Sequence, residues 1–257
     1  MHLIVQYEAA IYYRFKILIS SVYTYPKILS LRKPETMMLR AFVFQSACVL
    51  GLFWAALPAR LYAQTGLTGH ETVLFKEEFD DNSKQWPIIN HGDTAFTQVE
   101  NGHYVLNIIN SSRWWALRLG VLSGLSQEPN VLEMKMKITT DALPVDYGII
   151  WNTVKQSTSV FNENSFLISN TREYCVLKKE NDTSYILRDW TNSASIKIND
   201  YNVLRIEEEE DGTHTFYINN HKVTHGKAPK SNLANFGFYI DAKTILSVDY
   251  IMIAVKK

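Results

Sequence analysis

The sequence is poor in cysteine, and this scarcity removes several classes of site. Its 257 residues include two cysteines, Cys48 and Cys175. Cys48 lies in an apolar N-terminal run that we expect to be removed, which leaves Cys175 alone in the mature chain. A single cysteine forms neither an intrachain disulfide nor a thiolate zinc cluster. Because Cys175 sits in a strand-like run, we interpret it as a buried structural thiol.

The chain also lacks an excess of either charge, with 26 basic and 26 acidic residues. Residues 1–63 hold seven Lys and Arg but two Asp and Glu, which leaves 19 basic and 24 acidic residues in the remainder. An acidic remainder is a poor ligand for phosphate backbones and anionic lipid surfaces. We therefore expect no nucleic-acid partner and no stable membrane insertion of the mature chain.

The motifs of common catalytic sites are missing as well. No HExxH pattern, no Gly-x-Ser-x-Gly turn and no glycine-rich phosphate loop occurs. The six histidines after residue 63 form no cluster with metal-ligand spacing. The sequence thus excludes the familiar zinc, serine-nucleophile and nucleotide signatures.

Residues 37–63 have the pattern of a signal peptide. A second Met start with an Arg precedes the apolar run 41–57, and Ala63 occupies the expected cleavage position before Gln64. We expect a secreted or periplasmic protein that is cleaved near Ala63. The alternative is a membrane anchor, because 17 apolar residues approach the spanning length, but Gln45 and Ser46 interrupt the run and favour cleavage.

Residues 1–36 precede that start and contain charges within their apolar stretch, so they make a poor spanning helix. We interpret them as translated from a mis-assigned start codon, with a genuine extension as the alternative. In either case they are non-structural, and residues 64–257 form the folded domain.

Residues 200–224, DYNVLRIEEEEDGTHTFYINNHKVT, carry the strongest local signal. Residues 202–208 alternate between apolar and polar, and Asp211-Gly212 and Asn219-Asn220 supply two tight turns between β-forming runs. This pattern predicts an antiparallel meander of three strands.

The rest of the mature chain reads in the same way. In residues 131–138, Leu and Met alternate with Glu and Lys, which predicts a strand with one buried and one solvent-exposed face. Asn101-Gly102 is a favoured hairpin turn, and Gly148 marks a close approach of a neighbouring chain or a ligand. No window shows a helical period. The expected strands are 71–79, 95–100, 103–109, 114–119, 131–138, 146–151, 165–169, 173–179, 184–190, 202–208, 214–218, 221–224, 235–240 and 245–255.

About a dozen short strands predict an all-β fold, either a sandwich or a closed barrel, and the mature length favours a two-sheet antiparallel jelly-roll β-sandwich. The segments EEFDDNSKQW, ENGHYVL, DYGIIWN, YNVLRIEEEEDGTHTFYINNHKV, NFGFYI and VDYIMIA follow in a recognisable order. In this order the mature chain resembles a concanavalin A-like lectin/glucanase domain, of the secreted kind common in Bacteroidetes-type bacteria. That superfamily includes lectins, laminin G-like modules and glycan-acting enzymes, so the fold does not select a function.

The resemblance allows a test for hydrolysis. Laminarinase-like members carry Glu-x-Asp-x-x-Glu on one strand, because retaining hydrolysis needs two neighbouring carboxyls. The sequence has no such triplet. Residues 207–210 are four consecutive glutamates beside a predicted turn, and we interpret them as an ordinary solvated hairpin end.

Aromatic and polar residues on the predicted strands are the better candidates for function. Sugar sites stack pyranose rings on Trp or Tyr and bond the hydroxyls with polar groups. The predicted ligand-binding residues are Trp114, Arg118, Trp151, Arg172, Tyr174 and Trp190. Packing in the core is the alternative for each ring.

A structural calcium ion is the one cofactor considered, since related sandwiches bind calcium through loop carboxylates. Asp80 and Asp249 are its predicted ligands, because first and last strands commonly pair in this fold. Turn capping is the alternative role for them.

These observations predict a non-catalytic module that binds a glycan or another cell-surface ligand. A glycan hydrolase or lyase of the same fold and a laminin G-like protein-interaction module are the alternatives.

Overall fold

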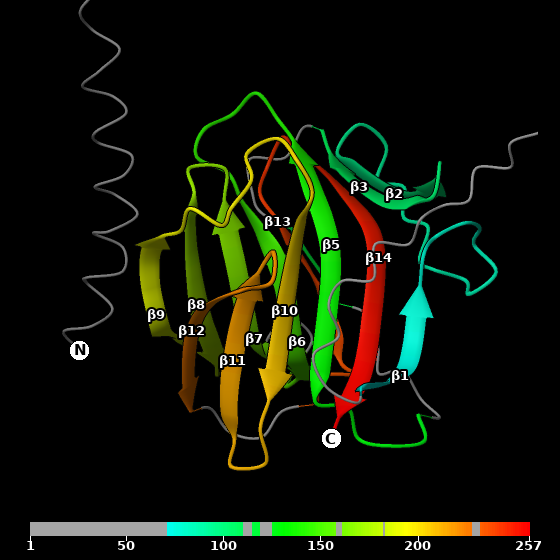
Figure 1. The fold of residues 1–257 in the computed structure, drawn as a ribbon. Coiled ribbons are helices and arrows are strands. Elements are labelled where there is room, and N and C mark those ends of the chain that lie inside the picture. Colours follow the sequence, from blue (N-terminus) through cyan, green and yellow to red (C-terminus); the bar gives the residue numbers. More distant parts are fainter. Residues whose placement is uncertain (1–70, 110–114, 119–124, 158–160, 182, 228–231) are drawn as a thin grey trace, which may run out of the picture. The chain divides into compact units, whose positions relative to one another are not determined.

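The computed structural model describes residues 71–109, 115–118, 125–157, 161–181, 183–227 and 232–257, except for the side chains of Trp115 and Arg118. Within these residues the chain forms two antiparallel sheets and no helix (Figure 1). The predicted all-β, two-sheet sandwich is therefore confirmed. A helix capable of crossing a membrane is likewise absent from these ranges. The predicted extension 1–36 and signal peptide 37–63 lie outside them.

The larger sheet has eight strands in the order β12-β11-β10-β5-β14-β3-β2, with β1 also pairing with β14. Its strands are β1 (Glu71–Glu77), β2 (Ala95–Glu100), β3 (His103–Ile108), β5 (Val131–Thr139), β10 (Asn202–Glu208), β11 (Thr213–Ile218), β12 (His221–Lys227) and β14 (Ile245–Lys256). The predicted meander is β10-β11-β12 at one edge of this sheet.

The smaller sheet has six strands in the order β4-β13-β6-β7-β8-β9. Its strands are β4 (Trp115–Arg118), β6 (Asp146–Lys155), β7 (Phe161–Ser169), β8 (Glu173–Glu180), β9 (Thr183–Asn192) and β13 (Phe236–Ile240). β9 and β4 are thus opposite edges of one sheet.

The last strand, β14, joins the parts of the larger sheet. One side of β14 pairs with β5 along most of its length. The other side pairs with β3 through residues 245–248 and with β1 through residues 251–256. Both ends of the domain are therefore fixed to the centre of this sheet, and the expectation that first and last strands pair is confirmed.

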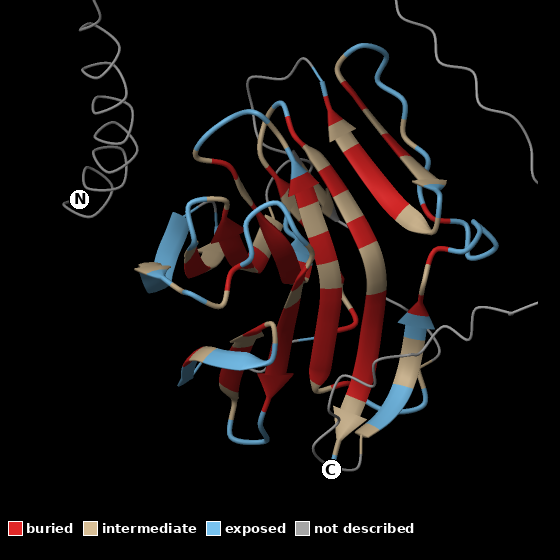
Figure 2. Ribbon diagram, turned by 45° about the horizontal axis from the view of Figure 1, so that its top comes forward, coloured by how far each residue is buried: buried red, intermediate tan, exposed pale blue. Residues whose placement is uncertain are grey.

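Side-chain alternation separates the core from the outer face of the larger sheet. In β5 the core residues Leu132, Met134 and Met136 are 0% exposed, and they alternate with Glu133 and Lys135 on the outer face. Burial of each apolar side chain of this size contributes roughly 1.5–3 kcal/mol. Figure 2 shows buried residues along the long central strands and exposed residues in the loops between them.

Two of the predicted turns have the backbone that their sequence requires. Asn101 and Gly102 both have positive φ, 50° and 74°, between β2 and β3. Asn219 and Asn220 have φ of 51° and 67° between β11 and β12. Positive φ at both central residues belongs to the type I′ turn, whose twist matches that of the flanking strands.

Gly148 confirms the expected close approach. A Cβ at this position would overlap the main chain of β7 at Phe166 and Leu167. A strand, and not a ligand, therefore accounts for the glycine.

Candidate ligand-binding face

Two predicted ligand residues belong to the core. Trp151 is 0% exposed, and its ring packs 5.8 Å from that of Phe216. Tyr174 is 3% exposed, and its hydroxyl donates to the carbonyl of Val223 at 2.7 Å. The prediction that these two rings stack on a ligand is therefore wrong, because the alternation of the strands points both of them into the core between the sheets.

The remaining predicted ligand residues are spread over the smaller sheet. Arg172 is exposed in the turn between β7 and β8, with φ of 65°. Trp190 is half-buried on edge strand β9, whereas Arg118 lies on the opposite edge strand, β4, with its Cα paired to Gly237. The side chain of Arg118 and all of Trp114 lie outside the described residues. The structure does not bring Trp190 and Arg118 together, and their role in binding stays a prediction.

The predicted calcium ligands have different surroundings. Asp80 is exposed just after β1. The carboxylate of Asp249 accepts the ammonium of Lys135 at 2.8 Å, and Nε2 of His103 lies 3.4 Å from it. In the part of the chain that the structure describes, no group of three His, Cys, Asp or Glu side chains is arranged to hold a metal ion. The calcium site gains no support from these contacts.

A β-bulge in β14 explains the orientation of Asp249. Val248 pairs with Met136 and Tyr250 pairs with Lys135, so Asp249 is the inserted residue. The core residues Val248 and Ile251 flank the bulge, and the extra residue lets Asp249 and Tyr250 both leave the core. An additional carboxylate is thereby placed on the outer face of the larger sheet.

Asp249 forms part of an aromatic and charged cluster on that face. The ring of Tyr201, just before β10, stacks on His103 with 5.7 Å between centroids and 20° between planes. The ammonium groups of Lys135 and Lys137 lie 5.1 Å and 5.4 Å from the Tyr201 centroid. Asp249 links Lys135 to His103. We call these five residues the Tyr201 subsite.

Two donors of the Tyr201 subsite are uncommitted. Among the residues that the structure describes, the Tyr201 hydroxyl has no hydrogen-bond partner and Lys137 has no ion pair. Both side chains are half-buried. Burial raises the pKa of Tyr201, and the charges of Asp249 and Asp200 raise it further, so the phenol keeps its proton at neutral pH. The subsite therefore offers a hydroxyl and an ammonium to a ligand.

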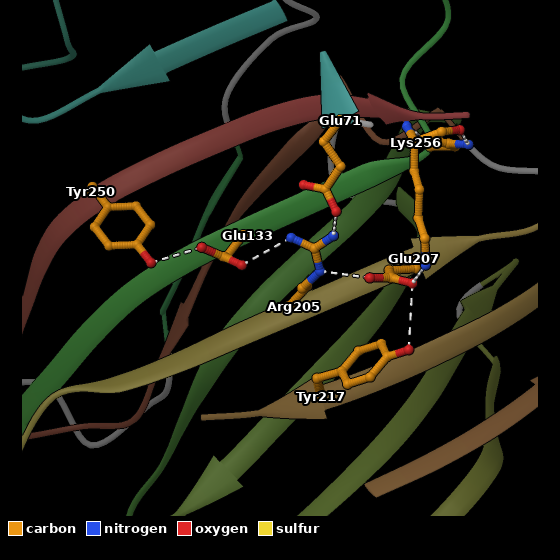
Figure 3. A network of polar contacts seen from close by, with 8 residues as sticks. Glu71, Glu133, Arg205, Glu207, Tyr217, Tyr250 and Lys256 are labelled. Atoms are coloured by element: carbon orange, nitrogen blue, oxygen red, sulfur yellow. Dashed lines mark hydrogen bonds and ion pairs between the residues drawn. The ribbon is translucent and has the colours of Figure 1, made fainter. Parts of the chain in front are cut away.

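Beside this subsite, Arg205 on β10 organises a second set of polar contacts (Figure 3). Its Nη2 donates to Glu71 Oε1 at 2.5 Å, its Nη1 to Glu133 Oε2 at 3.1 Å and its Nε to Glu207 Oε1 at 2.7 Å. Figure 3 shows all three carboxylates directed at the guanidinium. The cluster joins β1, β5 and β10 on the outer face.

Three further side chains complete this arginine network. Tyr250 donates its hydroxyl to Glu133 at 2.7 Å, and Lys256 donates to Glu207 at 2.6 Å. Tyr217 reaches the same carboxylate of Glu207 at 3.4 Å. Burial would raise the pKa of Glu207, but hydrogen bonds from Lys256 and Arg205 outweigh it and lower that pKa. The carboxylate of Glu207 is therefore held as an anion by its neighbours.

The structure corrects the interpretation of residues 207–210 as a solvated end. Glu207 and Glu208 are each 6% exposed, while Glu209 and Glu210 are exposed. The alternation of β10 could have predicted this, because Arg205 and Glu207 occupy odd positions and the core residues Leu204 and Ile206 occupy even ones. Arg205 and Glu207 therefore lie together on the outer face. Tyr201 was also missed, since its partners come from three other segments of the chain.

The outer face of the smaller sheet has a different chemistry. Phe166 and Ile168 of β7 point into the core, so Ser165 and Leu167 lie on the outer face with Glu163. Ser165 and Leu167 place a hydroxyl and an apolar group along this strand. Of these three outer residues of β7, Glu163 alone is a carboxylate, so the strand presents no row of them.

Two aspartates are joined at one end of the smaller sheet through the main chain of one and the side chain of the other. The main-chain N–H of Asp146 donates to Asp241 Oδ2 at 2.9 Å, and the Tyr239 hydroxyl lies 3.4 Å from Asp241 Oδ1. Burial raises the pKa of Asp241, although the bonds from Asp146 and Tyr239 partly offset this effect. A buried carboxyl with a raised pKa is one feature that acid–base sites share.

Neither a family model nor a curated protein sequence matches the chain. Among solved structures, the β-glucanase of Bacillus licheniformis matches 76% of this chain and 100% of its own at 11% identity, with a TM-score of 0.51. The protein has the concanavalin A-like fold. The resemblance seen in the sequence is thereby confirmed for the fold.

Other structures with the concanavalin A-like fold match at lower TM-scores. The carbohydrate-binding module CBM66 from Bacillus subtilis has a TM-score of 0.38 at 13% identity, over 71% of this chain and 95% of that one. The κ-carrageenase of Pseudoalteromonas carrageenovora has a TM-score of 0.45 at 12% identity, over 77% of this chain and 100% of that one.

Proposed function

We propose that the protein is a secreted, non-catalytic carbohydrate-binding module whose ligand lies on the outer face of the larger sheet at the Tyr201 subsite. The observation that carries this proposal is the half-buried Tyr201 ring with an uncommitted hydroxyl, stacked on His103 and contacted by the ammonium groups of Lys135 and Lys137. An aromatic ring with nearby hydrogen-bonding groups is a common element of sugar sites. A β-glucanase shares the fold, which makes a glycan the first ligand class to test.

Binding at this face needs no movement of the main chain. Lys135 and Lys137 lie on β5 and His103 lies on β3, so rigid strands hold the groups around the ring. A sugar ring would contact the Tyr201 ring, and its oxygens would accept from the phenol and the ammonium groups. Preorganised groups reduce the ordering entropy that a flexible site loses on binding.

A non-catalytic role is supported by the state of the nearby carboxylates. Asp249 is bound by Lys135, Glu133 by Arg205 and Tyr250, and Glu207 by Arg205 and Lys256. A general acid must carry a proton near its operating pH, and hydrogen bonds from Lys256 and Arg205 lower the pKa of Glu207 instead. These carboxylates are better suited to linking the strands of the larger sheet than to proton transfer.

The experiment is a glycan-array assay on the purified protein, repeated with added calcium and with a chelator. We expect retention of at least one glycan without turnover. Tyr201→Ala should abolish retention with little change in melting temperature, whereas Tyr185→Ala, at a 48% exposed residue on β9, should retain it. Loss of binding in chelator would support the calcium site near Asp80 and Asp249. N-terminal sequencing of the exported protein tests cleavage after Ala63.

Absence of binding to every glycan on the array would overturn glycan binding and favour a protein partner. Edge strand β9 would then be the surface to examine, because Tyr185, Ile186 and Leu187 are 48%, 49% and 44% exposed.

A second candidate function is that of a glycan hydrolase or lyase whose site lies on the smaller sheet. The observation in its favour is the raised pKa of Asp241 next to Asp146. Release of reducing ends from a bound glycan, lost in Asp241→Asn but kept in Tyr201→Ala, would establish the enzyme and overturn the non-catalytic proposal.

A further inference from the structure

We propose that the Tyr201 subsite recognises an anionic group of the ligand, a sugar carboxylate or sulfate. This inference rests on the proposed function and names the class of glycan. Its basis is the balance of donors and acceptors at the subsite. The groups that remain for a ligand are the hydroxyl of Tyr201 and the ammonium of Lys137, and both can donate hydrogen bonds.

One oxygen of the subsite's acceptor, Asp249, is already engaged. Asp249 is 30% exposed, and its two carboxylate oxygens face Lys135 at 2.8 Å and His103 at 3.4 Å. Nδ1 of His103 donates to the carbonyl of Asn101 at 2.7 Å, so Nε2 can donate to Asp249 only when the ring carries both protons. A neutral sugar hydroxyl needs an acceptor for its own proton, and the ion pair with Lys135 occupies one of the two oxygens of Asp249.

The charges of the subsite favour the same class of ligand. Asp249 balances Lys135, while Lys137 lies over the aromatic ring of Tyr201. Asp200 lies beside Tyr201, but its Oδ1 accepts the Tyr201 main-chain N–H at 2.7 Å. An incoming oxyanion would replace the cation–π contact of Lys137 with a charge-assisted hydrogen bond, which is the stronger interaction.

Geometry makes the recognition local. Lys135 and Lys137 are two residues apart on β5, so both project from the same face of the strand. The Tyr201 ring lies against both ammonium groups. An acidic substituent of a sugar bound at this ring would therefore have the ammonium of Lys137 close by.

The test uses two pairs of probes, each of which sets an acidic glycan against its uncharged counterpart. The first pair is hexameric oligogalacturonate and its full methyl ester, and the second is dextran sulfate and unmodified dextran. Affinities are measured by titration calorimetry with the purified protein. We expect one acidic probe to bind at least about tenfold more tightly than its neutral partner, since hydrogen bonds to charged groups are worth more than neutral ones. The probe that binds distinguishes carboxylate from sulfate.

Variants then place the effect on named groups. Lys137→Gln should weaken the acidic probe about tenfold, and Tyr201→Phe should weaken it several-fold while keeping the ring. Lys155→Gln removes the same charge at an exposed residue of β6 and should leave affinity unchanged. Melting temperatures of all three variants should match that of the parent protein.

The outcomes separate the two proposals. Equal binding of acidic and neutral partners, or equal loss in Lys137→Gln and Lys155→Gln, would overturn anionic recognition at this subsite. Binding of neutral array glycans without either acidic probe would also overturn it, while the proposed function stands. Absence of binding to every glycan would overturn both.

Discussion

Arg205 and Glu133 face each other directly across β10 and β5, with Arg205 Nη1 3.1 Å from Glu133 Oε2. Both side chains are at most 10% exposed, although they lie on the face away from the sandwich core. A slip of one residue between these strands would turn the arginine into the core. The pair, with Glu71 and Glu207, therefore specifies the register of β1, β5 and β10 as well as contributing contacts.

Replacing Arg205 with Met should lower the free energy of unfolding by about 3–5 kcal/mol. The reason is that Glu71 and Glu133 lose their cation and Glu207 keeps Lys256 alone, and breaking a buried pair leaves an uncompensated charge. Urea unfolding followed by tryptophan fluorescence measures the change. Arg172→Met, at an exposed turn, is the matched control and should change stability by less than about 0.5 kcal/mol. A loss below about 1 kcal/mol in Arg205→Met would show that water replaces the arginine.

Local pattern was sufficient to predict the strands of this sandwich. The alternation in 131–138 depends on the two-residue period of a strand, and Asn101-Gly102 depends on positive φ, so both can be recognised from neighbouring residues. Gly148 was predicted for the same reason. The contact that explains it belongs to β7 and could not be named from the sequence.

The candidate site depended on contacts between distant residues and was largely missed. Glu207 looked like one of four solvated glutamates, because its burial depends on Lys256 and Arg205 acting together. Tyr201 has His103 as its stacking partner, almost a hundred residues earlier in the chain. Trp151 was the opposite case, since an aromatic on a strand has no local feature that tells the core face from the ligand face.

Gly148→Ala should destabilise the fold by about 1–3 kcal/mol, because the new methyl group would overlap the main chain of β7 at Phe166. Thermal unfolding by circular dichroism measures the effect. Gly226→Ala is the control, since a Cβ there meets no atom within 4 Å. If both variants melt together, the two strands separate easily and the glycine has no packing role.

Glu207→Gln should reduce stability at neutral pH and leave it nearly unchanged in acid. The folded protein lowers the pKa of Glu207 below its ordinary value of 4.5. A carboxylate with a lowered pKa stabilises the fold above that ordinary value and loses this contribution as the pH falls through the folded pKa. The gap in unfolding free energy between parent and variant should therefore close below about pH 4.5.

The control for this prediction comes from the same run of glutamates. Glu210 is exposed, so Glu210→Gln should leave the parent's stability unchanged at either pH. Urea titrations at about pH 7 and about pH 3 are sufficient. A constant gap across that range would show that packing, and not charge, carries the effect of Glu207.

Asp241 should show the opposite sign. Burial raises its pKa above the ordinary 3.8, so the folded state holds the proton more tightly than the unfolded chain does. The stabilising contribution is then complete at low pH and is lost as the pH rises through the raised value. Asp241→Asn stays neutral, and its amide oxygen can still accept the N–H of Asp146. The variant should therefore be at least as stable as the parent at pH 7, with its advantage vanishing in acid.

Melting temperatures across the acid range test this sign, with exposed Asp93→Asn as the control that removes a carboxylate without burial. A lower melting temperature for Asp241→Asn at neutral pH would mean that the ionised carboxylate is favoured by its surroundings, and the raised pKa would be wrong. The same result would weaken the enzymatic alternative, because a general acid on the smaller sheet requires a carboxyl that keeps its proton. A variant that is more stable but no longer releases reducing ends would instead show that Asp241 lowers stability while supporting activity. This trade-off is expected of an active-site residue.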